Sequence, residues 1–307
     1  MKPMLKNLTF ILTLLVSSVL FVGCDKDDDN NSPSTKSITQ IVIDNPDFSI
    51  LEAAVVRAGL GDALASGNLT VFAPDNAAFN ASGITESMIS ALPVSTLDSI
   101  LKYHVLGAPV TAAQVPASDT VKTLLGLNIY ASSNANGVFV NGIKVKTADI
   151  AASNGVIHTI SKVLMPPTST IAGIAASNPD FSLLVAAVVK AGLLDAISSA
   201  GKYTVFAPTN AAFNAAGFNS VEDINNASTE LITNVVKYHV LATNVAAGDL
   251  INGATPSTLQ GGTLTVGLAP APNVKVTGSS AAVSNITGAD IIATNGIIHV
   301  IDKVLLP

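Results

Sequence analysis

The sequence predicts an α+β protein built from two tandem copies of one unit, with helices first and strands later in each copy. Three observations lead to this prediction: sequence blocks that occur twice in the same order, apolar residues at helical spacing early in each copy, and Asn-Gly turn signals among apolar runs late in each copy. The 307 residues suit two domains of about 100–150 residues. We expect these domains at 38–166 and 168–307.

The duplication is visible in blocks of four to eleven residues. The spacing between equivalent residues grows from 133 for Asn45 and Asn178 to 141 for Asn154 and Asn295, which indicates added loop residues in the second copy. A repeat of this length is a duplicated domain rather than a solenoid unit. The blocks are NPDFS (45–49, 178–182), TVFAP (70–74, 204–208), YHVL (103–106, 238–241) and NG-x-IH (154–158, 295–299).

The first helix of each unit is predicted from its start signal, its apolar face and its stop signal. Asn45 followed by proline suits a helix N-cap with Pro at the first helical position. Phe48, Leu51 and Val55 share one helical face, and Gly59 stands where a helix ends on a left-handed residue. The second copy repeats this pattern.

A buried strand is predicted over 69–73, and a second helix follows it. Asp75 and Thr209 occupy equivalent positions before this helix, and both residue types cap helices, so we expect a structural role for both. A further helix near 95–103 leads into the Tyr-His pair of the first copy.

The rest of each unit is predicted to be strands joined by tight turns. Asn154-Gly155, Asn295-Gly296 and Asn141-Gly142 are typical of type I′ hairpins. Structural roles are assigned to Asn154, Gly155, Asn295 and Gly296. Proline at 166–167 and at Pro307 is expected to mark the end of the last strand, since Pro cannot continue a ladder.

Taken together, the repeated TVFAP-x-NAAF, Tyr-His and closing NG-x-IH-x-I-x-KVL blocks resemble the fasciclin domain, twice and in the same order. The resemblance implies a wedge-shaped β-sandwich core with packed helices in each unit. It also implies an adhesion or matrix-binding module without general catalytic activity and without a cofactor.

The resemblance further implies candidate binding residues, since the Asp-Ile pair before the last hairpin and the Tyr-His region contact integrins in animal members. These positions are Asp149, Ile150, Asp290, Ile291, Tyr103, His104, Tyr238 and His239. The residues alone allow other roles: the two Asp side chains could cap turns, and the two Ile side chains could belong to the core.

The histidines His158 and His299 stand inside apolar strands, and each unit holds only two histidines. A zinc site would need a third ligand and supporting residues around it. We therefore expect these two side chains to be buried and hydrogen-bonded, with a structural role, and we predict no metal site.

The amino terminus predicts a lipoprotein. Basic residues precede an apolar run at 8–22, too short for a membrane span, and Gly23 precedes the chain's one cysteine. We predict a signal peptide at 1–23, a membrane anchor through lipid (palmitate) on Cys24, and an acidic disordered tether at 24–37. The acidic residues behind the cysteine resemble the export signal of surface lipoproteins in Bacteroidetes. We expect the protein to lie on the outer surface of the outer membrane. The sequence leaves the periplasmic face as an alternative location.

Several classes of function are disfavoured by the sequence. With a net charge of −6 and no basic cluster, the chain is a poor candidate for nucleic-acid binding. It lacks the GxSxG, GxxxxGK[ST], GxGxxG and HExxH motifs, so no enzyme activity is predicted.

The predicted function is that of a non-catalytic, surface-anchored adhesion lipoprotein with a protein or matrix partner. The alternative is a lipoprotein that captures a small apolar molecule or a glycan. The sequence identifies neither the partner, nor which domain binds, nor the oligomeric state.

Overall fold

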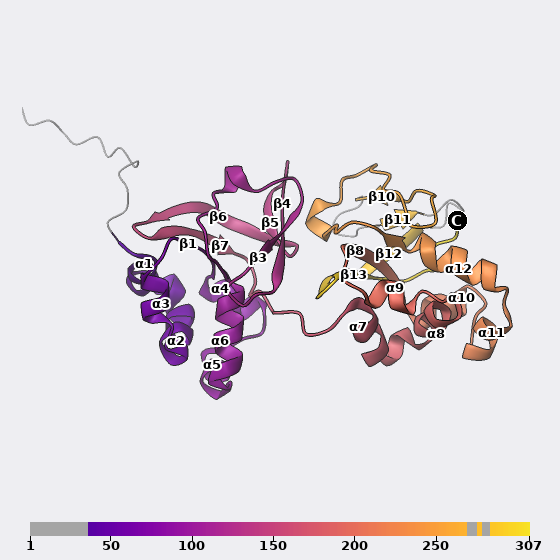
Figure 1. Cartoon of the computed structure of the whole chain (residues 1–307), viewed down its shortest axis with the longest axis horizontal. Coiled ribbons are helices and arrows are strands. Elements are labelled where there is room, and N and C mark those ends of the chain that lie inside the picture. Colours follow the sequence, from indigo (N-terminus) through magenta and orange to yellow (C-terminus); the bar gives the residue numbers. More distant parts are fainter. Residues whose placement is uncertain (1–35, 269–274, 278–282) are drawn as a thin grey trace, which may run out of the picture. The chain divides into compact units, whose positions relative to one another are not determined.

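A computed structural model describes residues 36–268, 275–277 and 283–307. The predicted signal peptide, Cys24 and the tether as far as residue 35 lie outside the described residues. Helices lie on one side of each domain and strands on the other, which confirms the α+β prediction (Figure 1).

The first domain begins with short helices and continues into a sheet. Its helices are α1 (Ile38–Asp44), α2 (Ser49–Ala58), α3 (Gly61–Ala65), α4 (Asn76–Ala81), α5 (Glu86–Ala91) and α6 (Val94–Tyr103), with 3₁₀ turns η1 (Pro46–Phe48) and η2 (Ala112–Gln114). Its strands are β1 (Leu69–Pro74), β2 (Val105–Leu106), β3 (Asp119–Lys122), β4 (Asn128–Asn134), β5 (Gly137–Val140), β6 (Ile143–Ala152) and β7 (Gly155–Ile160).

The second domain repeats this order. Its helices are α7 (Ile171–Ser177), α8 (Ser182–Lys190), α9 (Leu194–Ser198), α10 (Asn210–Ala215), α11 (Val221–Asn226) and α12 (Thr229–Tyr238), with 3₁₀ turns η3 (Pro179–Phe181) and η4 (Ala247–Asp249). Its strands within the described residues are β8 (Tyr203–Pro208), β9 (Val240–Leu241), β10 (Thr265–Gly267), β11 (Lys275–Thr277), β12 (Val283–Ala293) and β13 (Gly296–Ile301).

Each sheet contains one parallel strand pair, which lies next to the two-residue edge strand β2 or β9. The first sheet has the order β2-β1-β7-β6-β5-β4-β3, and the second has the order β10-β11-β12-β13-β8-β9. β1 runs parallel to β7 and β8 runs parallel to β13, whereas the other pairs are antiparallel. The parallel pairing places Phe72 beside His158 and Phe206 beside His299. Each unit therefore joins its first strand to its last, and the fold closes only when the unit is complete.

Glycine at the start of the last strand is required by this parallel pairing. A Cβ on Gly155 would lie 2.0 Å from the carbonyl oxygen of Leu69, and one on Gly296 would lie 2.1 Å from that of Tyr203. Both glycines also adopt a positive φ, 147° and 158°. Only glycine allows the two backbones this approach.

The turns before these strands differ from the prediction. Ala152 pairs with Gly155, so the two central residues are Ser153 and Asn154, and neither has a positive φ. A type I′ turn requires a positive φ at both central residues, so that prediction is wrong for Asn154-Gly155 and for Asn295-Gly296. The last strands also end earlier than predicted, at Ile160 and Ile301.

The predicted helices α2 and α8 are present, and Gly59 ends α2 with φ 67°. Asp75 caps α4 by accepting a hydrogen bond from the backbone of Ala78, and Thr209 caps α10 through Ala212. The short helices α1, α3 and α5 were not predicted. They contain five to seven residues each, too few to show a helical apolar pattern.

Two apolar layers form on the two faces of the first sheet. The helical layer packs α1, α2 and α6 on β1 and β7, with Phe48, Leu51 and Ile157 among its buried residues. The opposite layer is enclosed by the sheet itself and contains Phe72 and Tyr103. The second domain has the equivalent two layers.

Among the described residues, no single helix is long and apolar enough to cross a membrane. Ile171–Ser177 with Pro179–Lys190 reaches that length and apolarity only when the two helices are joined across a bend of 108°.

Candidate functional site

The predicted Tyr-His pair of the first domain lies at the end of α6, inside the protein. His104 caps this helix, and its Nδ1 lies 2.8 Å from the carbonyl oxygen of Ile100. The backbone N–H of Leu164 donates to His104 Nε2 over 2.9 Å. Because an N–H can only donate, Nε2 is the acceptor, and Nδ1 carries the proton that it donates to Ile100. His104 therefore fastens the segment after β7 to the end of α6.

His239 repeats this arrangement in the second domain. Its Nδ1 lies 2.7 Å from the carbonyl oxygen of Val235, and the N–H of Leu305 donates to its Nε2 over 2.9 Å. Burial lowers the pKa of His104 and of His239 from 6.5 to about 4, because the charged ring is poorly solvated there. Both rings are neutral at pH 7, with every ring nitrogen hydrogen-bonded.

The tyrosines next to these histidines are also buried. The Tyr103 hydroxyl donates to the carbonyl oxygen of Asn128 and accepts from the side chain of Asn141, both over 3.0 Å. Burial raises the pKa of Tyr103 to about 12. Tyr238 donates to the carbonyl oxygen of Thr263 over 2.6 Å.

Burial determines how the Tyr-His residues could take part in binding. The exposed fractions of Tyr103, His104, Tyr238 and His239 are 0%, 3%, 0% and 2%. A partner that docks on the folded domain meets none of these side chains directly. Any effect of the Tyr-His pair on binding must act through the backbone that it holds.

Asp149 lies on an irregular stretch of β6, where the pairing with β7 shifts register. Its φ is 60°, an uncommon conformation for a residue other than glycine. The carboxylate accepts a hydrogen bond from the N–H of Ala112 over 2.9 Å, and the Asp149 N–H donates to His158 Nδ1 over 3.2 Å. His158 Nε2 then donates to the carbonyl oxygen of Val110 over 2.8 Å. The two histidines of one domain thus carry opposite tautomers.

The second domain contains the same network around Asp290. Its φ is 57°, its carboxylate accepts from the N–H of Ala247 over 2.7 Å, and its N–H donates to His299 Nδ1 over 3.3 Å. His299 Nε2 lies 2.9 Å from the carbonyl oxygen of Val245. Burial lowers the pKa of His299 and raises the pKa of Asp290. In each domain the Asp-His pair therefore links the irregular stretch of the long strand, β6 or β12, to the 3₁₀ turn η2 or η4.

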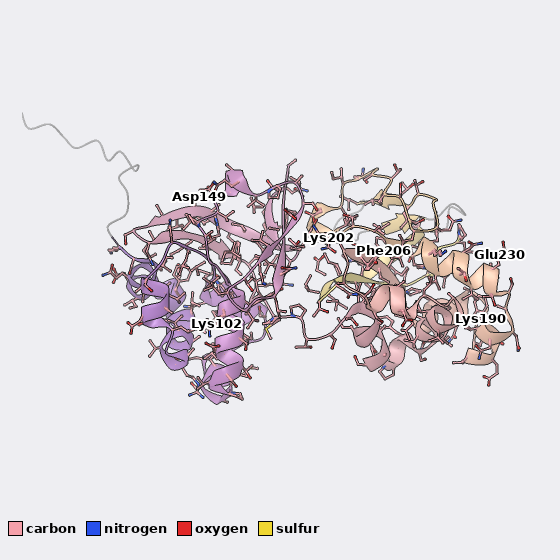
Figure 2. The ribbon with its side chains drawn as sticks, viewed as in Figure 1. Lys102, Asp149, Lys190, Lys202, Phe206 and Glu230 are labelled. Atoms are coloured by element: carbon pink, nitrogen blue, oxygen red, sulfur yellow. The ribbon has the colours of Figure 1, made fainter. Side chains whose placement is uncertain are left out.

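The Asp-Ile pairs divide between surface and core. The Asp149 side chain is exposed on the strand side of the first domain, whereas Lys102 of α6 lies on the helical side (Figure 2). Ile150 and Ile291 are half-buried and pack on the helical apolar layer of their own domains. The described structure therefore leaves Asp149 as the candidate binding side chain most open to a partner.

Asn154 and Asn295 have a role that the turn pattern did not reveal. Asn154 accepts from the N–H of Ile38 over 2.8 Å and donates to the carbonyl oxygen of Leu64 over 2.9 Å. Asn295 accepts from Ile171 over 2.9 Å and donates to Ile197 over 2.8 Å. Each asparagine ties the first and third helices of its domain to the last hairpin.

No group of three or more His, Cys, Asp and Glu side chains suited to a metal occurs in the described part of the chain. All four histidines hydrogen-bond through both ring nitrogens to their own domain. The rings therefore have no nitrogen available for a ligand or for proton transfer in the folded state.

The structure therefore contains two domains of the same fold. In each of them the repeated His, Asp and Asn side chains hydrogen-bond to the backbone of their own domain. The family model described as the fasciclin domain matches residues 46–166 and 179–307. The chain belongs to the fasciclin family.

The chain is similar to proteins from animals and bacteria. It is 30% identical over 245 residues to transforming growth factor-beta-induced protein ig-h3 of Sus scrofa, covering 78% of this chain and 35% of that protein. It is 42% identical over 137 residues to Protein sll1483 of Synechocystis sp., covering 44% of this chain and 76% of that protein. The solved FAS1 domain pair from the insect cell adhesion molecule fasciclin I has a TM-score of 0.43 and 20% identity, covering 88% of this chain and 96% of that one. The chain spans about a third of the length of the first of these relatives.

Proposed function

We propose that this protein is a bacterial lipoprotein of the Bacteroidetes type that displays two fasciclin domains on the outer-membrane surface and acts in adhesion without catalysis. The observation that carries the non-catalytic part is the commitment of all four histidines to hydrogen bonds within their domains. Family membership supports the binding role. The charged leader, the apolar run and Cys24 support the lipid anchor.

The surface around Asp149 is the proposed contact. Asp149 is exposed, its carboxylate accepts a hydrogen bond from the N–H of Ala112, and its own N–H, in an uncommon backbone conformation, donates to His158. A residue held in this way loses little conformational freedom on binding, which favours affinity. Two domains on one anchored chain would add avidity through effective concentration. Asp290 is the equivalent position of the second domain, but it is half-buried, so we expect it to contribute less than Asp149.

The location is tested by protease treatment of intact cells, with a periplasmic protein as the control. We expect the domains to be released while the periplasmic protein stays intact. Replacement of Cys24 by Ala should transfer the chain from the membrane fraction to the soluble fraction. Protection of the domains until the outer membrane is broken would contradict surface display and make cell-to-cell adhesion untenable.

The contact is tested by adhesion of beads that carry the full chain to cells and to a panel of matrix proteins. We expect Asp149→Ala to weaken adhesion, and the double variant Asp149→Ala/Asp290→Ala to weaken it further. Lys102→Ala, on the helical side of the first domain, serves as the matched surface control. Equal adhesion of the double variant and the unchanged chain would contradict the assignment of this surface.

Capture of a small molecule is the second candidate function, and one observation supports its apolar form. The helical layer of the first domain contains an apolar cavity of about 150 Å³. A sugar ring would find few hydrogen-bonding partners there, so the cavity supports no glycan.

A further inference from the structure

The cavity of the first domain lies between α1, α2 and α3 on one side and β1 on the other. Apolar side chains from these four elements form most of its wall. They include Ile38, Val42, Leu51, Val55, Leu64 and Val71. All of these side chains are less than 9% exposed. The volume of about 150 Å³ exceeds the gaps that ordinary side-chain packing leaves in a protein core.

The cavity offers a guest few hydrogen-bonding groups. His104 lines it, but both ring nitrogens already bond to Ile100 and Leu164. Thr39 also lines it, and its hydroxyl donates to the carbonyl oxygen of Gly61 over 3.2 Å. A buried water needs two to four polar partners, so this space favours an apolar guest over water.

Two features at the edge of the cavity bear on the kind of guest. Ile43 and Val56 line it and are 51% and 70% exposed, so an apolar molecule meets an apolar rim. The apolar wall would leave a charge of either sign poorly solvated, and the carboxylate of Glu52, which also lines the cavity, would in addition repel an anion. The site therefore suits an uncharged guest.

The second domain has the same cavity in a much smaller form, about 40 Å³. Gly61 of the first domain corresponds to Leu194 of the second, and Glu52 corresponds to Val185. A Cβ on Gly61 would meet no atom within 4 Å, so space is open there. Leu194 lines the smaller cavity and places a four-carbon side chain at this position. The larger side chain at this position thus accompanies the smaller volume, although Leu194 is itself 41% exposed.

We propose that the first domain, but not the second, binds a small uncharged hydrocarbon ring, the size of benzene, in this cavity. An apolar cavity of about 150 Å³ engineered into another protein binds benzene and excludes water. A ligand of six carbon atoms that makes no hydrogen bond is expected to bind with a Kd on the order of 1 mM. This proposal rests on the cavity alone and stands or falls independently of adhesion.

The test is a titration of residues 24–307 with benzene, followed by methyl NMR. Ser34–Pro307 forms one compact unit, so this chain retains every described element. We expect saturable shifts of the methyl signals of Ile38, Leu51 and Leu64. The equivalent signals of Ile171, Leu184 and Ile197 should not move, and they serve as a control within the same molecule. Absence of shifts, or equal shifts in both domains, would overturn the proposal.

A second ligand and two variants make the test specific. Benzoate should bind at least tenfold more weakly than benzene, because its carboxylate would lose its hydration in the apolar cavity and would be repelled by Glu52. Gly61→Leu copies the second domain and should weaken benzene binding at least tenfold, whereas Gly61→Ala should retain it. The first-domain methyl signals recorded without benzene, compared with those of the unchanged chain, report whether that domain is folded in each variant. Equal binding of benzoate and benzene, or unchanged benzene binding by folded Gly61→Leu, would contradict the assignment. If Gly61→Leu does not fold, the titration of the unchanged chain remains the deciding test.

Discussion

The first and second domains differ in the size of an apolar side chain in the helical layer and agree in the hydrogen bonds of a buried histidine. Gly61 in one domain is Leu194 in the other, and the cavities beside them measure about 150 and 40 Å³. His104 and His239, by contrast, make the same two hydrogen bonds with the same geometry. Apolar contacts are non-directional, so residues of different size are exchangeable there. A buried histidine ring that bonds both a backbone N–H and a backbone carbonyl is hard to replace, because most substitutions would leave one of these groups without a partner.

The Asp75 and Lys146 pair shows the same contrast on the surface. The Lys146 ammonium pairs with the Asp75 carboxylate, which also caps α4. The second domain has Thr209 and Thr287 at the equivalent positions, so the cap is kept and the ion pair is absent. The cap satisfies a backbone N–H and is common to both domains, whereas the exposed ion pair contributes little.

The largest expected effect is the loss of a buried histidine. His104→Ala would leave the Leu164 N–H and the Ile100 carbonyl without their partner and would open space in the core. We expect a loss of about 3–5 kcal/mol in the free energy of unfolding of the first domain. His239→Ala should cost the second domain a similar amount. Urea denaturation with hydrogen exchange read for each domain checks both values, and a loss below about 1 kcal/mol in either domain would contradict the shared role.

Acidification should weaken both domains in parallel. The unfolded chain binds protons on these histidines near pH 6.5, whereas the folded chain does so only near pH 4, because burial lowers the pKa of His104 and His239 to about 4. Stability should therefore fall as the pH falls from about 6.5 to 4, by up to about 3 kcal/mol for each histidine. Urea midpoints at pH 7, 6 and 5 avoid most carboxylate titration. Midpoints independent of pH in this range would show that the histidines are not neutral when folded.

A smaller effect should separate the cap from the ion pair. Asp75→Thr keeps the cap and should cost at most about 1 kcal/mol, with the loss reduced by salt. Thr209→Ala removes the cap of the second domain and should cost about 1 kcal/mol at any salt concentration. A double-mutant cycle of Asp75→Thr and Lys146→Thr, measured by thermal unfolding at low and high salt, isolates the pair. A coupling that grows with salt would contradict the ion-pair explanation.

The smallest effect concerns two glycines only two residues apart. Gly61 lies in helical α3 with open space around its Cα, so Gly61→Ala should stabilise the first domain by a few tenths to 1 kcal/mol. Gly59 has φ 67°, so Gly59→Ala should destabilise it by about 1 kcal/mol. Gly192, with φ 66°, provides the matched position in the second domain. Thermal unfolding of Gly59→Ala, Gly61→Ala and Gly192→Ala measures these changes in stability. Stability changes of equal sign for Gly59→Ala and Gly61→Ala would contradict the explanation.

Local signals explain which parts of this protein could be predicted from its residues. The helix that ends at Gly59, the strand that ends at Pro74 and the caps at Asp75 and Thr209 depend on neighbours within a few positions. Short helices such as α3, with five residues, contain too few positions for a pattern. The hairpin turn at Asn154 was predicted one residue out of place, because the Asn-Gly signal reflects backbone approach and not turn type.

The candidate site was less predictable than the fold. The Tyr-His pair was a plausible binding motif in the sequence, yet the structure buries both residues. Asn154 was assigned to a turn, but its side chain joins Ile38 to Leu64, partners 116 and 90 residues away. Gly61 lines the cavity, and this role is visible only in the structure and in comparison with Leu194 at the equivalent position of the second domain.

The sequence by itself determined that this chain is a duplicated α+β unit, because its repeated blocks and short-range signals are properties of neighbouring residues. Only the tertiary structure decided that the parallel pair β1–β7 closes the unit, that His104 bonds to Leu164 sixty residues away, and that the first domain retains a cavity. These features join distant segments through directional bonds and through the volume left between packed side chains. Neither property belongs to any local stretch of the chain.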